Sequence, residues 1–270
     1  MKQWVINDWY HSFRVYLVWA RMVWLRHLEY RFDTISGSFG SIFWVFGTLA
    51  TYRLIFNRVS SLAGWSWQEM IVLYGLYNLW WGLMTAFFNG GLRLAEHVRR
   101  GSLDRVLLWP GKAFFYASMK FEPMLLVHFL TGVIIFVLAL KTASISIGGI
   151  NFLLAIILIL NSLIIIYFIS ILFGLTSFWI VENRDLVDLF WLWESLAKYP
   201  ADFFARSRWW YWAVYSILPV AFIATVPTEV ILGKIKLGAV LGAFLVTIIL
   251  GFLAWYFWRL GLRRYTSASS

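Results

Sequence analysis

The sequence contains one long uncharged apolar stretch, residues 150–181, which reads INFLLAIILILNSLIIIYFISILFGLTSFWIV. A helix needs roughly 20 apolar residues to cross the hydrocarbon core of a bilayer. The stretch has 32 residues, so it predicts an integral membrane protein. At a helical rise of 1.5 Å per residue it would be about 48 Å long. Because the core is only about 30 Å thick, we expect this helix to tilt or to project from the membrane.

The composition favours the same class. Hydrophobic residues make up 61% of the chain and charged residues 13%, against about 45–50% and about 25% in soluble domains. The 18 tryptophans are typical of membrane–water interfaces. A net charge of +10 would suggest nucleic acid in a soluble protein, but here anionic lipid headgroups are the expected partner. The chain has no cysteine, which excludes disulfides and cysteine-based metal or redox chemistry.

Further apolar stretches predict an all-α polytopic protein with six crossings. Besides residues 150–181, these stretches are 35–56, 69–88, 123–140, 209–226 and 237–258. With a cytoplasmic N-terminus, 18 Lys and Arg residues fall inside and five outside. The positive-inside rule therefore places both termini in the cytoplasm.

Residues 9–31 predict a helix that does not cross. Its apolar part, residues 15–25, is too short to span a bilayer and contains Arg21. We expect it to lie in the cytoplasmic interface, with Val18, Met22 and Leu25 buried against the bundle. The chain then divides into a cytoplasmic N-terminus (1–34), a transmembrane domain (35–260) and a cytoplasmic tail (261–270). Residues 1–8 lack the apolar core of a signal peptide, so we expect no cleavage there.

Several enzyme classes lack their motifs. No phosphate-binding P-loop and no nucleophile elbow occurs. The four histidines have no metal-ligand spacing, and His128, alone in the third crossing, is expected to make an interhelical hydrogen bond. An energy-driven role would therefore need a separate ATPase chain.

Two pairs of glycines predict close helix packing. Gly75 and Gly82 lie on one face of the second crossing, and Gly238 and Gly242 form a Gly-x-x-x-Gly pair in the last one. These pairs are compatible with a dimer.

The connection between the second and third crossings reads GLRLAEHVRRGSLDRVLLWP (91–110). We expect one helix to end at Gly101 and a second to begin after Ser102 as N-cap, with Asp104 in its first turn. Leu103, Val106 and Leu107 would give the second helix an apolar face. Such a helix–break–helix on the cytoplasmic side is suited to docking, although an ordinary basic loop would also satisfy the positive-inside rule.

Residues 99–110, RRGSLDRVLLWP, resemble the Arg-x-Gly-Thr-Leu-Asp-x-x-Leu-x-x-Pro signature of ABC-2 family transporter permeases, the membrane subunits of type 2 ABC exporters. Downstream, KYPADFF (198–204), LPVAFIATVP (218–227) and LG (232–233) resemble a second conserved block of that family. Ser102 replaces the usual Thr, and Trp109 replaces the usual Arg. With the N-terminal helix, the resemblance covers almost the whole chain.

The resemblance implies a non-catalytic permease in a bacterial plasma membrane that exports a hydrophobic or amphipathic substrate. It would form a dimer of identical or related chains and contact membrane lipids, but no nucleic acid. Loop 92–110 would dock on a cytoplasmic ATPase subunit, which would bind ATP and Mg²⁺; this chain would hold no cofactor or metal. The docking residues would be Arg99, Arg100, Gly101, Ser102, Leu103, Asp104, Leu107 and Pro110.

The family template also implies a different topology near the end of the chain. It makes residues 185–204 the fifth crossing and residues 209–226 a re-entrant element, within a region 184–228, whereas hydropathy makes 209–226 the fifth crossing. Charged residues at a bilayer centre cost about 2.5–3.5 kcal/mol each on insertion scales, which opposes the template. The template lowers the Lys and Arg bias only to 15 inside and eight outside. We favour the template and keep both alternatives open.

The translocation pathway would be lined mainly by the second and fifth crossings. The candidate residues are Asn78, Trp81, Asp188, Glu194, Tyr199, Pro200, Pro219 and Pro227. A stand-alone proton- or ion-coupled carrier, using Asp188 or Glu194 as the coupling acid, is the alternative function. A membrane enzyme acting on lipid is a third reading, which the aromatic content alone suggests.

Overall fold

The computed structural model describes residues 2–108, 113–118, 120–143, 148–180, 184–204, 207, 209–210, 213–217 and 219–265, with backbone alone at 2–12, 31, 33, 184 and 216–217. Within these ranges the chain is helical, and its only β-type pairing is an isolated bridge between Leu62 and Trp65. The α-helices are α1 (Lys2–Glu29), α2 (Arg31–Phe56), α3 (Trp67–Leu83), α4 (Leu92–Arg99), α5 (Leu103–Leu107), α6 (Ala113–Ala117), α7 (Leu126–Thr142), α8 (Gly149–Leu175), α9 (Arg184–Glu194), α10 (Ala201–Phe204), α12 (Thr225–Ile231) and α13 (Leu237–Arg264).

Five helical segments are long and apolar enough to cross a membrane. They are Thr34–Phe56, Trp67–Arg99, Pro123–Thr142, Gly149–Phe178 and Leu237–Arg264. Each corresponds to a crossing expected from the sequence. The stretch 209–226 forms no long helix in its described part, which contains a π-helical turn, Ala213–Ile217, and a 3-10 turn, Val220–Phe222. The count of six crossings stays a prediction.

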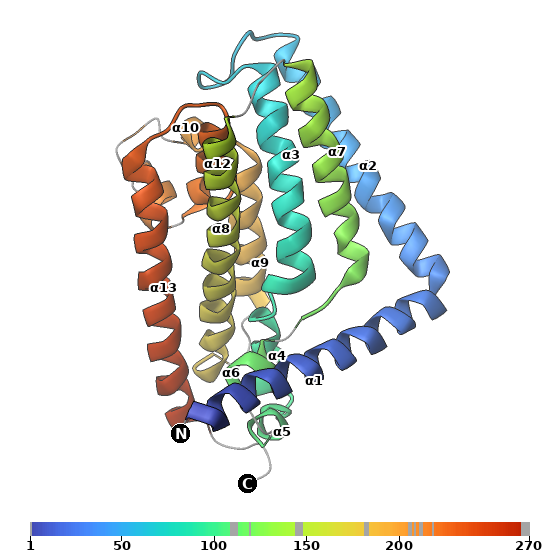
Figure 1. The fold of residues 1–270 in the computed structure, drawn as a ribbon, viewed down its shortest axis with the longest axis vertical. Coiled ribbons are helices and arrows are strands. Elements are labelled where there is room, and N and C mark those ends of the chain that lie inside the picture. Colours follow the sequence, from blue (N-terminus) through green and yellow to red (C-terminus); the bar gives the residue numbers. More distant parts are fainter. Residues whose placement is uncertain are drawn as a thin grey trace.

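The long helices lie side by side, and α1 crosses one end of the bundle (Figure 1). Helices α4, α5 and α6 lie at that same end, which we call the α5 end. The α2–α3 connection, α10 and α12 lie at the opposite end, the α12 end. The buried core runs through α3, α8 and α12.

The N-terminal helix is confirmed, and it continues at Tyr30 into α2. The expected burial of Val18, Met22 and Leu25 is wrong, because all three are exposed. Helix α1 meets the rest of the chain through other side chains: Val23 is buried, and the Tyr16 hydroxyl donates to the Lys120 carbonyl at 3.0 Å. The exposed apolar side chains and Arg21 therefore share a surface that suits a lipid interface.

Glycines bring α3 and α7 into backbone contact, as the sequence predicted for Gly75 and Gly82. A Cβ on Gly75 would lie 2.7 Å from the Phe136 nitrogen, and one on Gly82 would overlap the Phe129 backbone. The other pair behaves differently within this chain. A Cβ on Gly238 would meet nothing within 4 Å, so a close helix contact there stays a prediction for a second chain.

Residues 184–204 run from the α5 end toward the α12 end (Figure 1). Two hydrogen bonds fix where they finish. The Tyr52 hydroxyl donates to the Lys198 carbonyl at 2.9 Å, and the Trp65 indole donates to the Asp202 carboxylate at 2.9 Å. Because Tyr52 and Trp65 flank the α2–α3 connection, Lys198 and Asp202 lie at the α12 end. The hydropathy model keeps residues 184–204 on the same side as the α4–α5 loop. The family template lets them cross to the opposite end, and the observed path agrees with the template in this respect.

Candidate functional site

The loop after α3 has the predicted helix–break–helix form. Helix α4 ends at Arg99, Gly101 adopts a φ of +64° that favours glycine, and α5 begins at Leu103. Asp104 lies in the first turn of α5, as expected. Ser102 occupies the N-cap position, but its side chain makes no capping hydrogen bond. Its hydroxyl instead lies 2.9 Å from Nδ1 of His97 and ties the two helices together across the break.

The two faces of α5 differ from the expectation. Leu103 is fully buried and Val106 is buried, in a cluster with the ends of α8 and α13. Leu107 is 37% exposed and the following Leu108 is 84% exposed. Leu103 and Val106 therefore hold α5 to its own bundle, and of the expected apolar face only Leu107 is exposed. Docking of this loop on a partner stays a prediction. Arg105, Leu107 and Leu108 remain on the outside. Trp109 and Pro110 lie outside the described residues.

Several contacts fix this loop to the bundle. Arg93 of α4 forms an ion pair with Glu122, just before α7. A Cβ on Gly91 would overlap the Ile171 backbone, so the start of α4 lies directly on α8. Burial and the nearby Asp104 carboxylate raise the pKa of the Tyr265 phenol, which follows the end of α13. A displacement of the loop would therefore be transmitted to three long helices.

Lys120 lies in the short segment between α6 and α7. The pKa of its ammonium group is lowered to about 8, chiefly by burial; Glu122 opposes this shift and Arg93 adds to it. Its carbonyl accepts the hydrogen bond from Tyr16 of α1. This segment therefore contacts both the N-terminal helix α1, through Tyr16, and helix α4, through Arg93.

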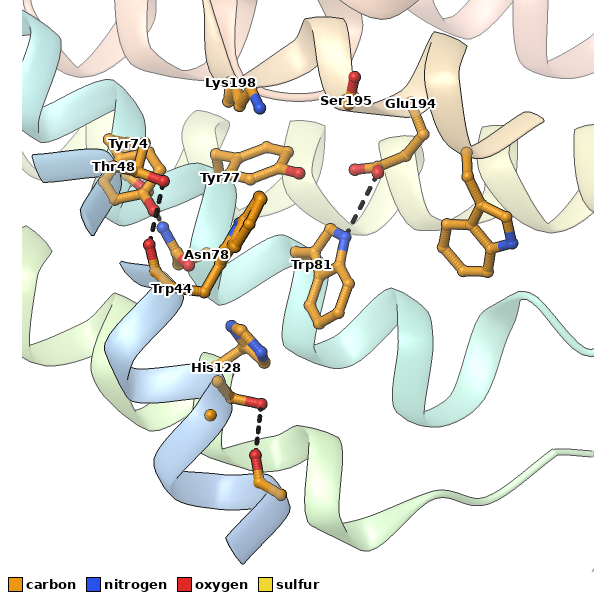
Figure 2. Close-up of a pocket in the computed structure, with 14 residues that line it drawn as sticks. Trp44, Thr48, Tyr74, Tyr77, Asn78, Trp81, His128, Glu194, Ser195 and Lys198 are labelled. Carbon is orange, nitrogen blue, oxygen red and sulfur yellow. Dashed lines mark hydrogen bonds between the residues drawn. The ribbon is translucent and has the colours of Figure 1, made fainter. Parts of the chain in front are cut away.

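A cavity of about 520 Å³ lies between α2, α3, α7 and α9 (Figure 2). Its size falls within the roughly 300–1,000 Å³ of small-molecule sites. Three of the predicted pathway residues line it, namely Asn78, Trp81 and Glu194. The remaining lining residues are Gly37, Gly40, Ser41, Trp44, Thr48, Tyr74, Tyr77, His128, Trp191, Ser195 and Lys198.

Glu194 is the buried acid of this cavity, with only 2% of its surface exposed. The Trp81 indole N–H donates to its Oε2 at 3.3 Å. Figure 2 shows the Tyr77 hydroxyl directed toward the same carboxyl group. Oε1 is buried and has no hydrogen-bond partner among the described residues. The other candidate acid, Asp188, is exposed on α9 and does not line the cavity.

Asn78 and His128 occupy the cavity wall in different ways. The Asn78 side-chain amide donates to the Tyr74 carbonyl at 2.8 Å, so its N–H group is satisfied within α3. The His128 ring packs edge-on against Trp81, with ring centroids 4.3 Å apart. The expected interhelical hydrogen bond from His128 is not found within the described part of the chain.

The other predicted pathway residues lie at the α12 end or in the core beside it, and none lines this cavity. The Tyr199 ring lies 5.8 Å from that of Tyr52, and Pro200 is buried. Pro219 precedes the 3-10 turn Val220–Phe222. Pro227 lies in the first turn of α12, where a helix has no use for the missing N–H.

Sequence reasoning missed the contribution of α2 to the cavity. Gly37, Gly40 or Ser41, Trp44 and Thr48 recur every three or four residues, which places them on one helix face. That pattern of small residues around one tryptophan was the available signal.

A family model described as ABC-2 family transporter protein matches residues 42–269. The chain belongs to the ABC-2 transporter family. The part of the ABC-2 permease that matches includes the α4–α5 loop, α9 and most of the cavity wall. Helix α1 and residues 31–41 of α2, with Gly37, Gly40 and Ser41, precede the match. No curated protein and no solved structure matches the chain.

Proposed function

We propose that this ABC-2 permease forms the export pathway of an ABC transporter and is driven by a separate ATPase subunit. The carrying observation is the α4–α5 loop, which is fixed to the bundle on one side and presents Arg105, Leu107 and Leu108 on the other. Such a surface transmits the movement of a docked subunit to the long helices. ATP and Mg²⁺ are then bound by the ATPase, since the permease sequence contains no P-loop.

The proposed topology places both termini and the α5 end in the cytoplasm of a bacterial cell, with the chain in its plasma membrane. Residues 184–204 make the fifth crossing, and residues 209–226 form the re-entrant element at the outer end. The hydrogen bonds of Lys198 and Asp202 at the α12 end support this path. Glu194 then faces a cavity rather than lipid, which removes the objection for this one charge of the crossing.

The proposed complex contains two permease chains, identical or related. Asp188 is exposed on α9 next to the exposed Leu189. In a crossing helix this carboxyl group needs a neighbour other than lipid, because charges within the bilayer are costly. A second permease chain beside α9 would supply one.

Copurification tests the central claim. The tagged permease, extracted from its host in mild detergent, should bring a nucleotide-binding ATPase with it. Leu108→Asp should abolish this recovery, because it places a charge on the outward side of the loop. Leu108→Met keeps an apolar side chain there and should retain the ATPase. Absence of any ATPase with the wild-type chain, or equal recovery with Leu108→Asp, would contradict the proposal.

Cysteine labelling tests the topology against a background free of native cysteine. Asp185 and Phe203 are both exposed and lie at opposite ends of the 184–204 segment. Asp185→Cys should react with an impermeant maleimide only in inside-out vesicles, and Phe203→Cys only in intact cells. Labelling of both from the cytoplasmic side would instead support the hydropathy model.

A stand-alone proton- or ion-coupled carrier is the second candidate, and the buried Glu194 with its unpartnered oxygen is the observation that favours it. Proteoliposomes containing only this chain would then collapse an imposed pH gradient without ATP. Glu194→Gln would abolish that activity, and Asp188→Asn would not. The ABC exporter hypothesis expects no such leak from either the wild type or the variants.

A further inference from the structure

The cavity between α2, α3, α7 and α9 combines a buried acid with aromatic walls. Glu194 contributes one oxygen to the Trp81 indole and leaves the other without a hydrogen-bond partner among the described residues. A buried carboxylate is unfavourable unless a positive charge or hydrogen-bond donors compensate it. The Trp81 indole and the Tyr77 hydroxyl, which is directed toward the carboxyl group, are both neutral, so Glu194 has no cation paired with it among the described residues.

Lys198, a basic side chain of the cavity wall, compensates Glu194 only in part. Its charge favours the ionised carboxylate, but its ammonium group lies over the Tyr199 ring, 5.6 Å from the ring centroid. No ion pair joins Lys198 to Glu194 among the described residues. The histidine of the cavity wall, His128, packs against the Trp81 ring rather than against the carboxyl group.

The remaining walls suit a cation with an apolar body. Trp44, Tyr77, Trp81 and Trp191 all line the cavity. Aromatic faces attract cations by roughly 0.5–2 kcal/mol per contact, more when water is excluded. A bare metal ion fits poorly, because a hard cation needs about six oxygen ligands, and no cluster of three His, Asp or Glu residues occurs in the described ranges.

We propose that this cavity binds an amphipathic organic cation, with Glu194 as its counter-ion and the tryptophan and tyrosine rings around its apolar part. An anion of the same shape would be repelled by Glu194, and a neutral molecule would leave the carboxylate unpaired. The role of the bound cation as export substrate rests on the proposed function, but its binding does not.

Helix α2 forms the accessible wall of this site. Trp44 is 68% exposed, and Gly40 also lines the cavity. A Cβ on Gly40 would meet nothing within 4 Å, so a longer side chain there would obstruct the cavity without straining the fold. Gly47, on the same helix, is equally open but does not line the cavity. The two glycines make a matched pair for a test.

The experiment measures binding of radiolabelled tetraphenylphosphonium to the purified permease in detergent, with no ATPase present. Radiolabelled tetraphenylborate, an anion of the same shape, is measured in a separate experiment, because the two ions form an insoluble salt when mixed. We expect saturable binding of tetraphenylphosphonium and much weaker binding of tetraphenylborate. Glu194→Gln should weaken it about tenfold or more, since truncating a buried charge partner has effects of that size. Asp188→Asn, an exposed acid on the same helix, should leave it unchanged.

One further pair of variants and one single variant separate binding from folding. Gly40→Met should weaken binding and Gly47→Met should not, with both proteins unchanged in gel filtration and melting temperature. Lys198→Met should bind the cation as well as the wild type or better. Weaker binding by Lys198→Met would show that Lys198 supports the site and would overturn the proposal. Equal binding by Glu194→Gln, or binding of tetraphenylborate as tight as that of tetraphenylphosphonium, would overturn it too.

The result of the cation-binding experiment is independent of the ATPase copurification experiment. Loss of cation binding with an intact ATPase complex would reject the cavity as a cation site and keep the exporter. Cation binding without any ATPase partner would keep the site and reject the exporter.

Discussion

On the side facing α7, helix α3 packs backbone against backbone, whereas on the side facing α2 and α9 it borders a cavity of about 520 Å³. The first side is made by glycines, Gly75 and Gly82 on α3 and Gly132 on α7. The second is made by large side chains, Tyr77 and Trp81, that do not fill the space they face.

This difference has a physical basis in the membrane. Lipid tails are as apolar as a leucine side chain, so helices associate through close van der Waals contact rather than through a hydrophobic driving force. The α3–α7 pair has such contact along its length and is expected to move as one unit. The α2 helix is mostly exposed and has little contact with α3, so it is the wall of the cavity that is freest to shift.

The strongest test of the tight side is Gly82→Leu. A Cβ at this position already overlaps the Phe129 backbone, so the variant must separate α3 from α7. Overpacking of this kind costs about 3 kcal/mol or more. We expect gel filtration to recover little folded protein, and thermal unfolding to give a lowered melting temperature for what is recovered. Gly47→Leu, on the loose α2 helix, should unfold like the wild type; similar damage by both would show that the two sides do not differ.

Sequence patterns predicted the tight side better than the cavity. Glycine spacing on α3 and five of the crossings are visible in a single chain, because each depends on local composition. The cavity brings together α2, α3, α7 and α9, and no local pattern records that assembly. Glu194 and Trp81 were selected individually, yet their hydrogen bond joins residues 113 positions apart in sequence.

Two predictions failed or stayed open for identifiable reasons. Helix α5 has five residues, too few for periodicity to show which apolar side chain faces inward, so Leu103 was assigned to the docking face. The charged side chains of residues 184–204 lower the mean hydropathy of this segment, so hydropathy alone does not identify it as a crossing. Burial of Glu194 beside a cavity, rather than apolar composition, places that segment within the bundle.

Helix α5 repeats the contrast between a packed and a free side. Leu103→Asp places a carboxylate in a fully buried position and should destabilise the fold by about 3 kcal/mol, through lost packing and an unpaired charge. Leu108→Asp changes an exposed side chain and should leave stability within about 0.5 kcal/mol. Thermal unfolding of both variants checks this, and equal melting temperatures would contradict the assigned faces.

On the cavity side the expected effects are smaller. Trp81→Phe keeps a ring against His128 but removes the indole N–H that donates to Glu194. The loss of a donor to a buried carboxylate should cost about 1–2 kcal/mol. Trp191→Phe is the control, because Trp191 lines the same cavity and has no hydrogen bond to Glu194 in the described structure. Equal melting temperatures of the two variants would show that the Trp81–Glu194 bond contributes little.

The smallest effect is expected at Lys120, where α1 meets the packed part of the bundle. Its pKa of about 8 in the folded protein is below the ordinary value of about 10.4, so burial destabilises the charged form. Between these two values the unfolded chain binds more protons, and stability therefore rises with pH. Lys120→Met should be more stable than the wild type by about 1 kcal/mol at pH 7, after allowance for partial exposure. The two melting temperatures should begin to converge above about pH 8 and become equal only above about pH 10.4, where lysine is neutral in the unfolded chain as well. A constant difference across this range would mean that packing, and not the charge, separates the two proteins.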